Sequence, residues 1–555
     1  MKKHTALMVL LVCLICISCD ESIISESQKT TIYNKHDSVP ATCERDGQIE
    51  YYVNQNGQFF VFEDGLFREV KEEDTVIKKT GHTIVEFRED EIIHFQYNKC
   101  CQCGKVFDYS LPIVNITCEE IEKDYNECII SVSNCLHEYQ LTGVPGQIKI
   151  RGNWTSNLEK KPYRIKFDKK QVLLGLNNDL AAKSWVLLAD YSDKSMLRSA
   201  IALFIANQIY GGKYYSSDCC FVEVYLNNDY QGVYLLVEQQ QINKGRVEIY
   251  ENEEDSSNNI GYLLEYDRYY YKEDPATIFE IEYSEIPYFN GYTADDSHFI
   301  KQYVVKNDLN NEGQRQFIND RLQKIWNIAY DALYINHDDL LNNPFLTINN
   351  EGEVVSDLSI KDSYEALERI IDVESLVDTY LLNEIVQDMD IGYSSFFLSI
   401  DLSADGNKKL VFQAPWDFDW SFGNSVKNLH SLFIGNYLKG EPDYEKSNPW
   451  LLLVSNAQWF WELLQEKWQQ LNCEELKNRI LEKIDFFTNH YNQFAKKEFE
   501  KWERNSLLVW CYSENSLSAR SQKDDSENLI NYISRRFSWL DYYLTDLKRV
   551  KPSFE

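Results

Sequence analysis

The sequence predicts an α+β protein with two lobes, preceded by a small β-rich module. Short β-prone runs separated by turn signals dominate up to about residue 310, and helical periodicity dominates after it. The chain has 555 residues, which is too many for one simple core, so two or more domains are expected. A mostly β first half followed by a mostly helical second half is typical of an enzyme whose site lies in the cleft between two lobes.

The first residues have the pattern of an export signal. Two lysines precede a nearly continuous apolar run over residues 6–18, and Ile17-Ser18-Cys19 resembles a lipobox. The run is too short to span a bilayer as a lasting helix. We therefore expect residues 1–19 to be a lipoprotein signal peptide and Cys19 to be the lipidated anchor of a bacterial cell-envelope protein, with surface display left open. An ordinary secretory peptide is the alternative.

A polar tether and a small module are expected next. Residues 20–45 are polar, and residues 46–107 contain short β-prone runs separated by Asn-Gly and Asp-Gly hairpin signals. The runs cover residues 49–53, 58–62 and 66–70. Nothing in this module suggests catalysis, so a spacer or adaptor role is expected. Residues 108–548 are assigned to the functional domain.

Charge and cysteine content limit the possible functions. A formal charge of -32 disfavours nucleic acid as a partner and leaves a basic protein substrate open. Six of the 14 cysteines lie between residues 100 and 135. The pair Cys100-x-x-Cys103 has a metal-ligand spacing, but no second spaced pair or histidine pair accompanies it, so disulfides are favoured over zinc. No HExxH motif occurs, which removes support for a metalloprotease.

Further elements follow from periodicity and turn signals. They are strands over residues 220–226, 232–238 and 247–250, a helix from a cap at Ser192 or Asp193 to about Ile209, and helices over 315–333 and 373–387, the last capped by Asp372.

Acidic residues flank a predicted hairpin in the second half. Asp390 and Ser395 come just before its first strand, and Asp417 and Asp419 come just after its second strand. Because hairpin pairing brings these two ends together, we expect the carboxylates on one side of a cleft. Magnesium prefers oxygen ligands, and phosphoryl transfer needs a carboxylate beside metal-neutralised phosphates. The pattern therefore points to phosphoryl transfer.

Several ordered segments resemble the spore-coat protein H (CotH) kinase family. They are residues 150–153 (IRGN), 160–167 (KKPYRIKF), 185–189 (WVLLA), 193–198 (DKSMLR), 224–227 (VYLN) and 232–238 (GVYLLVE), then Asp390 with Ser395, and residues 416–424 (WDFDWSFGN). The resemblance covers about 108–548. It implies an atypical two-lobed protein kinase-like fold and an enzyme that uses ATP and Mg²⁺ to phosphorylate Ser or Thr of a protein substrate.

The resemblance also implies roles for the acidic residues. Asp390 would be the catalytic carboxylate, with Asp388 as a close rival. Asp417 would bind metal, and Asp419 would bind metal or orient the loop. Many relatives have Asn where this chain has Ser395, so the second metal site would use a hydroxyl.

Basic and nucleotide-facing roles are implied in the same way. Lys161, or its neighbour Lys160, would bind phosphate. Arg151 could also reach phosphate, since Gly152 permits a close backbone approach. Glu238 would contact the nucleotide or, alternatively, form a structural ion pair.

Two other functional classes remain open. A non-catalytic surface lipoprotein could use the same fold to bind a glycan or a protein partner through aromatic loops. A glycosidase with paired carboxylates is the weaker possibility, because no matching acid partner accompanies the loop.

Overall fold

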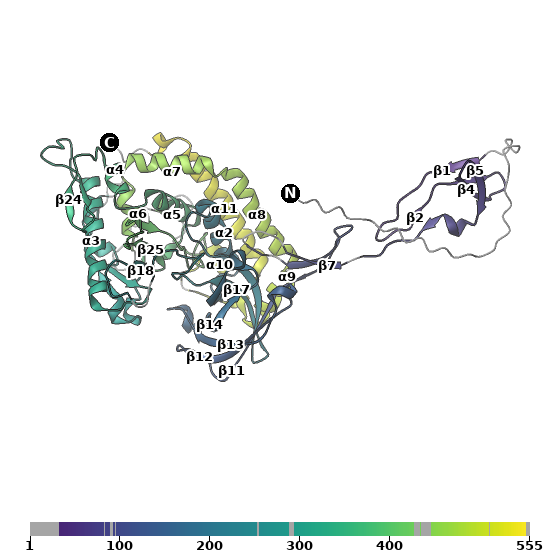
Figure 1. The fold of residues 1–555 in the computed structure, drawn as a ribbon, viewed down its shortest axis with the longest axis horizontal. Coiled ribbons are helices and arrows are strands. Elements are labelled where there is room, and N and C mark those ends of the chain that lie inside the picture. Colours follow the sequence, from purple (N-terminus) through teal and green to yellow (C-terminus); the bar gives the residue numbers. More distant parts are fainter. Residues whose placement is uncertain are drawn as a thin grey trace. The chain divides into compact units, whose positions relative to one another are not determined.

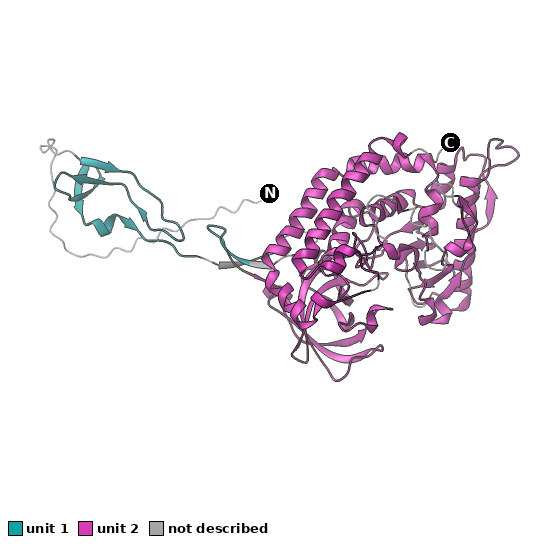
Figure 2. Cartoon of the chain, turned by 180° about the vertical axis from the view of Figure 1, so that it is seen from behind, with its two compact units in different colours: residues 1–87, 97–108 teal, residues 88–96, 109–555 magenta. Residues whose placement is uncertain are grey.

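The computed structural model describes residues 33–82, 84–88, 93–94, 96–251, 255–287, 293–426, 433–434, 446–509 and 511–550. Cys19 lies outside these residues, so its lipidation stays a prediction. The chain divides into two compact units (Figure 2): unit 1 is Met1–Phe87 with Tyr97–Asp108, and unit 2 is Arg88–Gln96 with Tyr109–Glu555. Within the described residues, no helix combines the length and apolar character that a membrane crossing requires.

Unit 1 is built from short antiparallel strands. Its four-stranded sheet has the order β1-β3-β4-β5, with strands Tyr33–His36, Tyr51–Asn54, Phe59–Glu63 and Leu66–Val70. Two further pieces are the pair β2 (Gly47–Gln48) with β6 (Val76–Ile77), and a sheet β10-β9-β7 formed by Val106–Ser110, Gln96–Cys100 and Ile84–Arg88. The Asn54 side chain accepts the amides of Asn56 and Gln58, which closes the predicted first hairpin.

The first half of unit 2 is a closed barrel of seven strands (Figure 1). In barrel order they are β11 (Ile113–Cys118), β12 (Asn126–Ser133), β13 (Leu141–Ile150), β14 (Tyr163–Val172), β15 (Ala181–Leu188), β17 (Asp229–Glu238) and β16 (Cys219–Leu226). Closure comes from β11, which pairs antiparallel with β12 and parallel with β16. The short strand β8 (Ile93–His94) adds to β16 in parallel. Alternate side chains such as Ile130 and Val132 fill the interior.

The second half of unit 2 combines a five-stranded sheet with helices. The sheet order is β19-β22-β18-β25-β26, with strands Ile278–Glu280, Gln302–Val305, Gly261–Tyr266, Phe396–Asp401 and Leu410–Phe412. Helix α2 (Arg198–Tyr210) lies between β15 and β16 in the chain but packs against α5 of this half. The other helices are α3 (Glu312–Tyr334), α4 (Ser363–Glu368), α5 (Val373–Val386), α6 (Pro449–Val454), α7 (Gln458–Gln470), α8 (Cys473–His490), α9 (Asn492–Lys501), α10 (Glu514–Ser518) and α11 (Gln522–Leu544). Small elements are α1 (Leu176–Asp179) and the strand pairs Ile286–Pro287 with Thr293–Ala294 and Leu346–Ile348 with Val354–Ser356.

Helix α5 is central to this half. Every one of its residues except Glu374 is buried, and it packs against α2, α7, α11 and β26. The predicted cap is confirmed, because the Asp372 carboxylate accepts the amide of Ser375. The helix ends at Gln387, which has the left-handed backbone conformation of a helix stop. This end sets the position of the acidic segment that follows.

The predicted α+β class is confirmed, with three differences in detail. Helix α2 begins at Arg198 and not after Asp193, because the Asp193 carboxylate accepts the amides of Ser195, Leu197 and Arg198 and holds a turn there. The strand predicted over 247–250 is reduced to a single bridge between Ile242 and Val247. The barrel closure was not predicted, since the parallel β11–β16 pair joins residues about a hundred positions apart.

Candidate active site

Ser395 and Asp417 meet at the open end of the β25–β26 hairpin. The strands pair with Leu398 opposite Phe412, so the residues before β25 and after β26 lie together. The Ser395 hydroxyl donates to Asp417 Oδ2 at 3.3 Å. Both residues have a positive φ, 62° for Ser395 and 68° for Asp417. Such backbone strain in residues other than glycine is concentrated at functional sites, where the surrounding structure maintains it.

Asp388 and Asp390 lie directly beyond the end of α5. The Asp388 carboxylate accepts the amide of Asp390 at 3.1 Å, which fixes a short turn. Asp388 is 2% exposed and Asp390 is half-buried. Burial raises the pKa of Asp388 well above its ordinary value, and the charges of Asp390 and Asp417 raise it further. Asp390 is therefore the more accessible of the two rivals for the catalytic role.

Asp419 is a buried member of the same group. Burial raises its pKa strongly, and the charge of Asp417 adds to that effect. The Ser192 hydroxyl donates to Asp419 Oδ2. The Asn424 amide group donates to the backbone carbonyls of Asp419, at 2.7 Å, and of Ser192, at 3.1 Å. These bonds join the loop after β26 to the loop after β15.

Asp190 is a site residue that the sequence reasoning missed. It follows β15 after one residue, has a φ of 39°, and its Oδ2 is buried without a hydrogen-bond partner among the described residues. Burial and then the charge of Asp193 raise the pKa of Asp190 to about 7, and Asp417 contributes in the same direction. The available signal was an acidic residue just after a strand, between the family-like segments 185–189 and 193–198.

Together these side chains form a carboxylate cluster, which we define as Asp190, Asp388, Asp390, Asp417 and Asp419. Mutual repulsion makes full ionisation unfavourable unless a cation enters. The donor set is carboxylate oxygens with the Ser395 hydroxyl nearby, and one Asp190 oxygen has no hydrogen-bond partner among the described residues. Oxygen donors of this kind are those that hard divalent cations such as Mg²⁺ prefer, so the donor types suit magnesium.

Arg151 brings positive charge to the cluster. Its Cζ lies 5.2 Å from the centre of the Trp416 ring, next to Asp417 in the chain. Burial lowers the pKa of Arg151, while the charges of Asp417 and Glu265 oppose that shift. The following Gly152 has a φ of +89°, and a Cβ there would come within 2.1 Å of the Thr155 hydroxyl oxygen. Glycine is therefore required for the turn that presents Arg151.

Lys160 and Lys161 point to different environments. The Lys160 amine is fully buried and donates to the Glu498 carboxylate at 2.8 Å, to the carbonyl of Ala189 at 3.0 Å and to the carbonyl of Val233. Burial lowers the pKa of Lys160 to about 8, although Glu498 opposes the shift. The Lys161 amine donates to the carbonyl of Ser156 at 3.0 Å.

Glu238 lies in a buried ion pair. Its Oε1 accepts from Arg246 Nε at 3.0 Å and from Asn177 Nδ2 at 3.0 Å, and its Oε2 accepts the amide of Asp218. Burial is the main reason that the pKa of Glu238 is raised, while Arg246 opposes the shift. This arrangement corresponds to the ion-pair alternative for Glu238.

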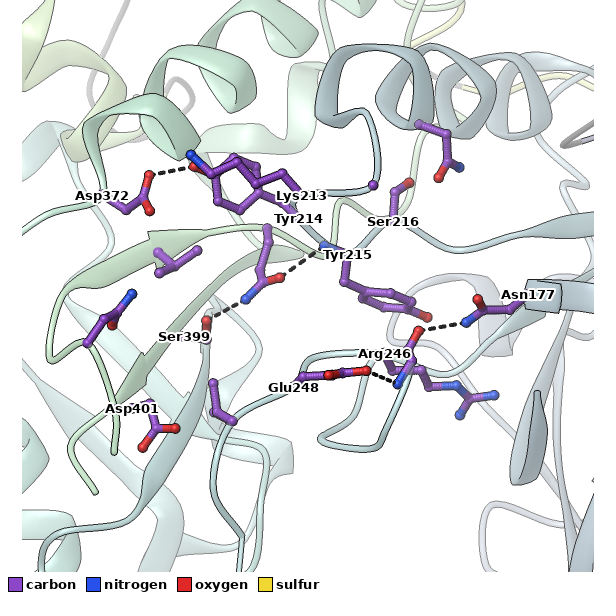
Figure 3. A pocket seen from close by; sticks show the side chains of 18 of the residues that line it. Asn177, Lys213, Tyr214, Tyr215, Ser216, Arg246, Glu248, Asp372, Ser399 and Asp401 are labelled. Carbon is purple, nitrogen blue, oxygen red and sulfur yellow. Dashed lines mark hydrogen bonds between the residues drawn. The ribbon is translucent and has the colours of Figure 1, made fainter. Parts of the chain in front are cut away.

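A cavity of about 780 Å³ borders the same hairpin (Figure 3). Ser399 of β25 and Arg246 are among the residues that line it. The Tyr214 hydroxyl points to Asp372 and donates to its carboxylate at 2.6 Å (Figure 3). The residues lining the cavity do not include the carboxylate cluster, so the hairpin strands connect two separate features: a polar cavity and the acidic residues at the strand ends.

Comparison with known proteins identifies one family. The family described as CotH kinase protein matches residues 148–540, which include the whole carboxylate cluster, Arg151, both lysines and Glu238. A comparison with curated proteins finds no match.

Proposed function

Since the chain belongs to the CotH kinase protein family, we propose that it is an atypical protein kinase that transfers a phosphoryl group from ATP to Ser or Thr of a protein substrate. One observation carries the proposal: Ser395 and Asp417 are hydrogen-bonded at the strand ends where the charges of Asp390 and Asp419 also converge. The proposed fold is the two-lobed kinase-like arrangement, with the barrel as first lobe and the β18–β26 sheet with its helices as second.

The residues present suggest a division of roles. Asp417, Asp419 and Ser395 would hold Mg²⁺, which when bound neutralises charge on the phosphates. Asp390 is half-buried and could accept the hydrogen bond of an incoming hydroxyl group. Arg151 would attract phosphate oxygens through its guanidinium group.

Lys161 remains the proposed phosphate lysine. The amine of Lys160 is enclosed by protein acceptors. The amine of Lys161, in contrast, donates to a backbone carbonyl and belongs to a half-buried side chain. Glu238 would then act on a nucleotide only indirectly, by holding Arg246 at the wall of the cavity.

The proposed location is the bacterial cell envelope. The lysines, the apolar run and the lipobox-like Ile17-Ser18-Cys19 support a lipid anchor at Cys19. Intact-mass measurement of the membrane-extracted protein tests this part separately, because a chain that begins at Cys19 and carries lipid is heavier than the same cleaved chain without lipid.

The enzymatic proposal is tested by transfer of labelled phosphate from ATP, with Mg²⁺, to the protein itself and to a basic protein. We expect Asp390→Asn and Asp417→Asn to reduce transfer by about a hundredfold or more. Asp168→Asn removes the same charge from an exposed position on β14 and should retain activity. A folded wild-type chain that neither transfers phosphate nor binds ATP would overturn the proposal and favour the alternative of a binding module for a glycan or protein.

A further inference from the structure

Unit 1 places four potential metal ligands together. The side-chain ligand atoms of Cys43, His82, Cys100 and Cys103 all lie within 4.8 Å of one another. The sequence showed only the Cys100-x-x-Cys103 pair. The other two ligands come from segments that are brought together by the β2–β6 pair, in which Gly47 is opposite Ile77. We call these four residues the Cys-His cluster.

Two distances within the cluster match those of a tetrahedral site. Cys43 Sγ and Cys100 Sγ are 3.6 Å apart, and Cys103 Sγ and His82 Nδ1 are 3.5 Å apart. Two thiolates bound to one tetrahedral zinc at about 2.3 Å lie about 3.8 Å apart, and a thiolate and an imidazole nitrogen lie about 3.6 Å apart. A disulfide would require sulfurs at about 2.05 Å. The cluster therefore has the spacing of ligands around a metal ion.

The backbone around Cys100 supports this interpretation. Residues 100–105 form the tight turn between β9 and β10. The backbone amide of Cys100 donates to the carbonyl of Lys105, and the backbone carbonyl of Cys100 accepts from the amide of Gly104, both at 2.9 Å. The amide of Gln102 donates to Cys100 Sγ at 3.4 Å. Gly104 has a φ of +72°, as this turn requires. Amide donation to the sulfur stabilises a thiolate, which is the form that binds metal.

His82 has the outer partner that a metal-bound histidine usually has. Its Nδ1 faces Cys103, and its Nε2 lies 3.4 Å from Glu44 Oε1. The Lys105 amine donates to the same Glu44 oxygen. A carboxylate on the second ring nitrogen fixes the tautomer that leaves the first nitrogen free to bind metal.

Unit 1 also needs a cross-link. Its described buried apolar side chains are Cys43, Tyr51, Phe60, Val61 and Cys100, and two of these belong to the Cys-His cluster. None of the three hydrophobic clusters found among the described residues includes a residue of this unit. Small domains with so little core usually depend on disulfides or a structural metal.

We propose that unit 1 binds one structural Zn²⁺ through Cys43, His82, Cys100 and Cys103. Four protein ligands leave no open coordination position, so this ion stabilises the unit and does not take part in catalysis. Cys101, although part of the same turn, is exposed and lies outside the cluster.

The test is metal analysis of the full chain, reduced, loaded with Zn²⁺ and then freed of excess metal. We expect about one zinc per chain. Cys100→Ser and Cys103→Ser should lose it, whereas the matched neighbour Cys101→Ser should retain it. His82→Cys supplies a fourth thiolate and should retain zinc, while His82→Ala should weaken binding at least about tenfold. Replacement by Co²⁺ should give the absorption of a tetrahedral thiolate complex.

Three outcomes would overturn the proposal. The first is a folded, reduced wild-type chain that retains no zinc. The second is equal zinc loss in Cys101→Ser and Cys103→Ser. The third is a Cys43–Cys100 disulfide in protein isolated from cells, detected by alkylation and peptide mass spectrometry. None of these outcomes depends on kinase activity, so failure here is distinguishable from failure of the proposed function.

Discussion

The carboxylate cluster and the Cys-His cluster are both groups of potential metal ligands, yet they differ in chemistry and in closure. The carboxylate cluster offers hard oxygen donors, and three of its members, Asp190, Asp390 and Asp417, are half-buried. The Cys-His cluster offers three soft sulfurs and one nitrogen, and it uses four ligands. Hard, partly open sites suit an exchangeable Mg²⁺ that arrives with phosphate, and closed sulfur-rich sites suit a permanent Zn²⁺.

The two clusters also differ in how they affect the stability of the units that contain them. Burial, and then like charges, raise the pKa values of Asp388 and Asp419, so the ionised carboxylate cluster is unfavourable in the absence of a cation. It is tolerated because unit 2 has an extensive core. The described residues of unit 1 form no comparable core, and this unit would depend on the proposed metal. If both proposals hold, the carboxylate cluster lowers the stability of unit 2 and supplies its reactivity, while the Cys-His cluster stabilises unit 1.

Removing zinc should have the largest effect. Structural zinc binding is worth about 10–16 kcal/mol in small zinc domains, which exceeds the stability of most domains of this size. We expect a strong chelator to unfold unit 1 while unit 2 stays folded. Amide hydrogen exchange of the full chain should show loss of protection in β3 and β4 but not in β16 and β17. Unchanged amide protection of β3 and β4 in metal-free protein would show that unit 1 does not depend on zinc.

Lowering the pH should stabilise unit 2 through the carboxylate cluster but weaken zinc binding by the Cys-His cluster. The pKa of Asp190, raised to about 7 from 3.8, means that the folded protein keeps a proton that the unfolded chain has released. The free energy of unfolding of unit 2 therefore falls as pH rises from about 4 to about 7, by up to about 4 kcal/mol from this group. Thiolate ligands, in contrast, lose zinc as pH falls.

Asp190→Asn sharpens this test. It should raise the stability of unit 2 at pH 8, without divalent cations, and change it little at pH 4. Denaturant unfolding at several pH values measures the difference. An equal change in stability at both pH values would show that the Asp190 proton is not responsible.

Magnesium should stabilise unit 2 more modestly. A ligand present at a hundred times its dissociation constant stabilises the folded state by about 2.7 kcal/mol. We expect Mg²⁺ with ATP to raise the melting temperature of unit 2 and Asp417→Asn to remove most of that increase. Asp168→Asn serves as the charge-matched control, because its side chain is exposed on β14. If Mg²⁺ with ATP raised the melting temperature of Asp417→Asn as much as that of the wild type, the cation would bind elsewhere.

The smallest expected effect is the difference in stability loss between alanine substitutions at two glycines with positive φ. Gly152, beside the carboxylate cluster, has a Cβ position 2.1 Å from the Thr155 hydroxyl oxygen, whereas Gly57 in unit 1 has nothing within 4 Å. Gly57→Ala should cost about 1 kcal/mol for the backbone conformation alone. Gly152→Ala should cost about 1–3 kcal/mol in total and displace Arg151. Denaturant unfolding measures both, and equal costs would contradict the crowding at Gly152.

Local signals explain what the sequence could predict. Strand β5 occupies the predicted 66–70, and α5 begins after its predicted Asp372 cap, because turn residues and caps act over a few positions. The meeting of Ser395 with Asp417 also followed from one hairpin. Long-range pairing explains what was missed: barrel closure joins β11 to β16. His82 reaches Cys103 from 21 residues away, outside any recognisable spacing.

The buried Lys160 amine has a consequence for how the nascent chain matures. Its carboxylate partner, Glu498, lies 338 residues later on α9, and the same side chain accepts the amide of Val233 in the barrel. A ribosome adding about 5–20 residues per second takes roughly 17–70 s to cover that interval. Until then the Lys160 ammonium ion lacks the carboxylate with which it forms its ion pair in the folded protein. Truncated products that end before α9 should therefore be recognised and degraded as incompletely folded.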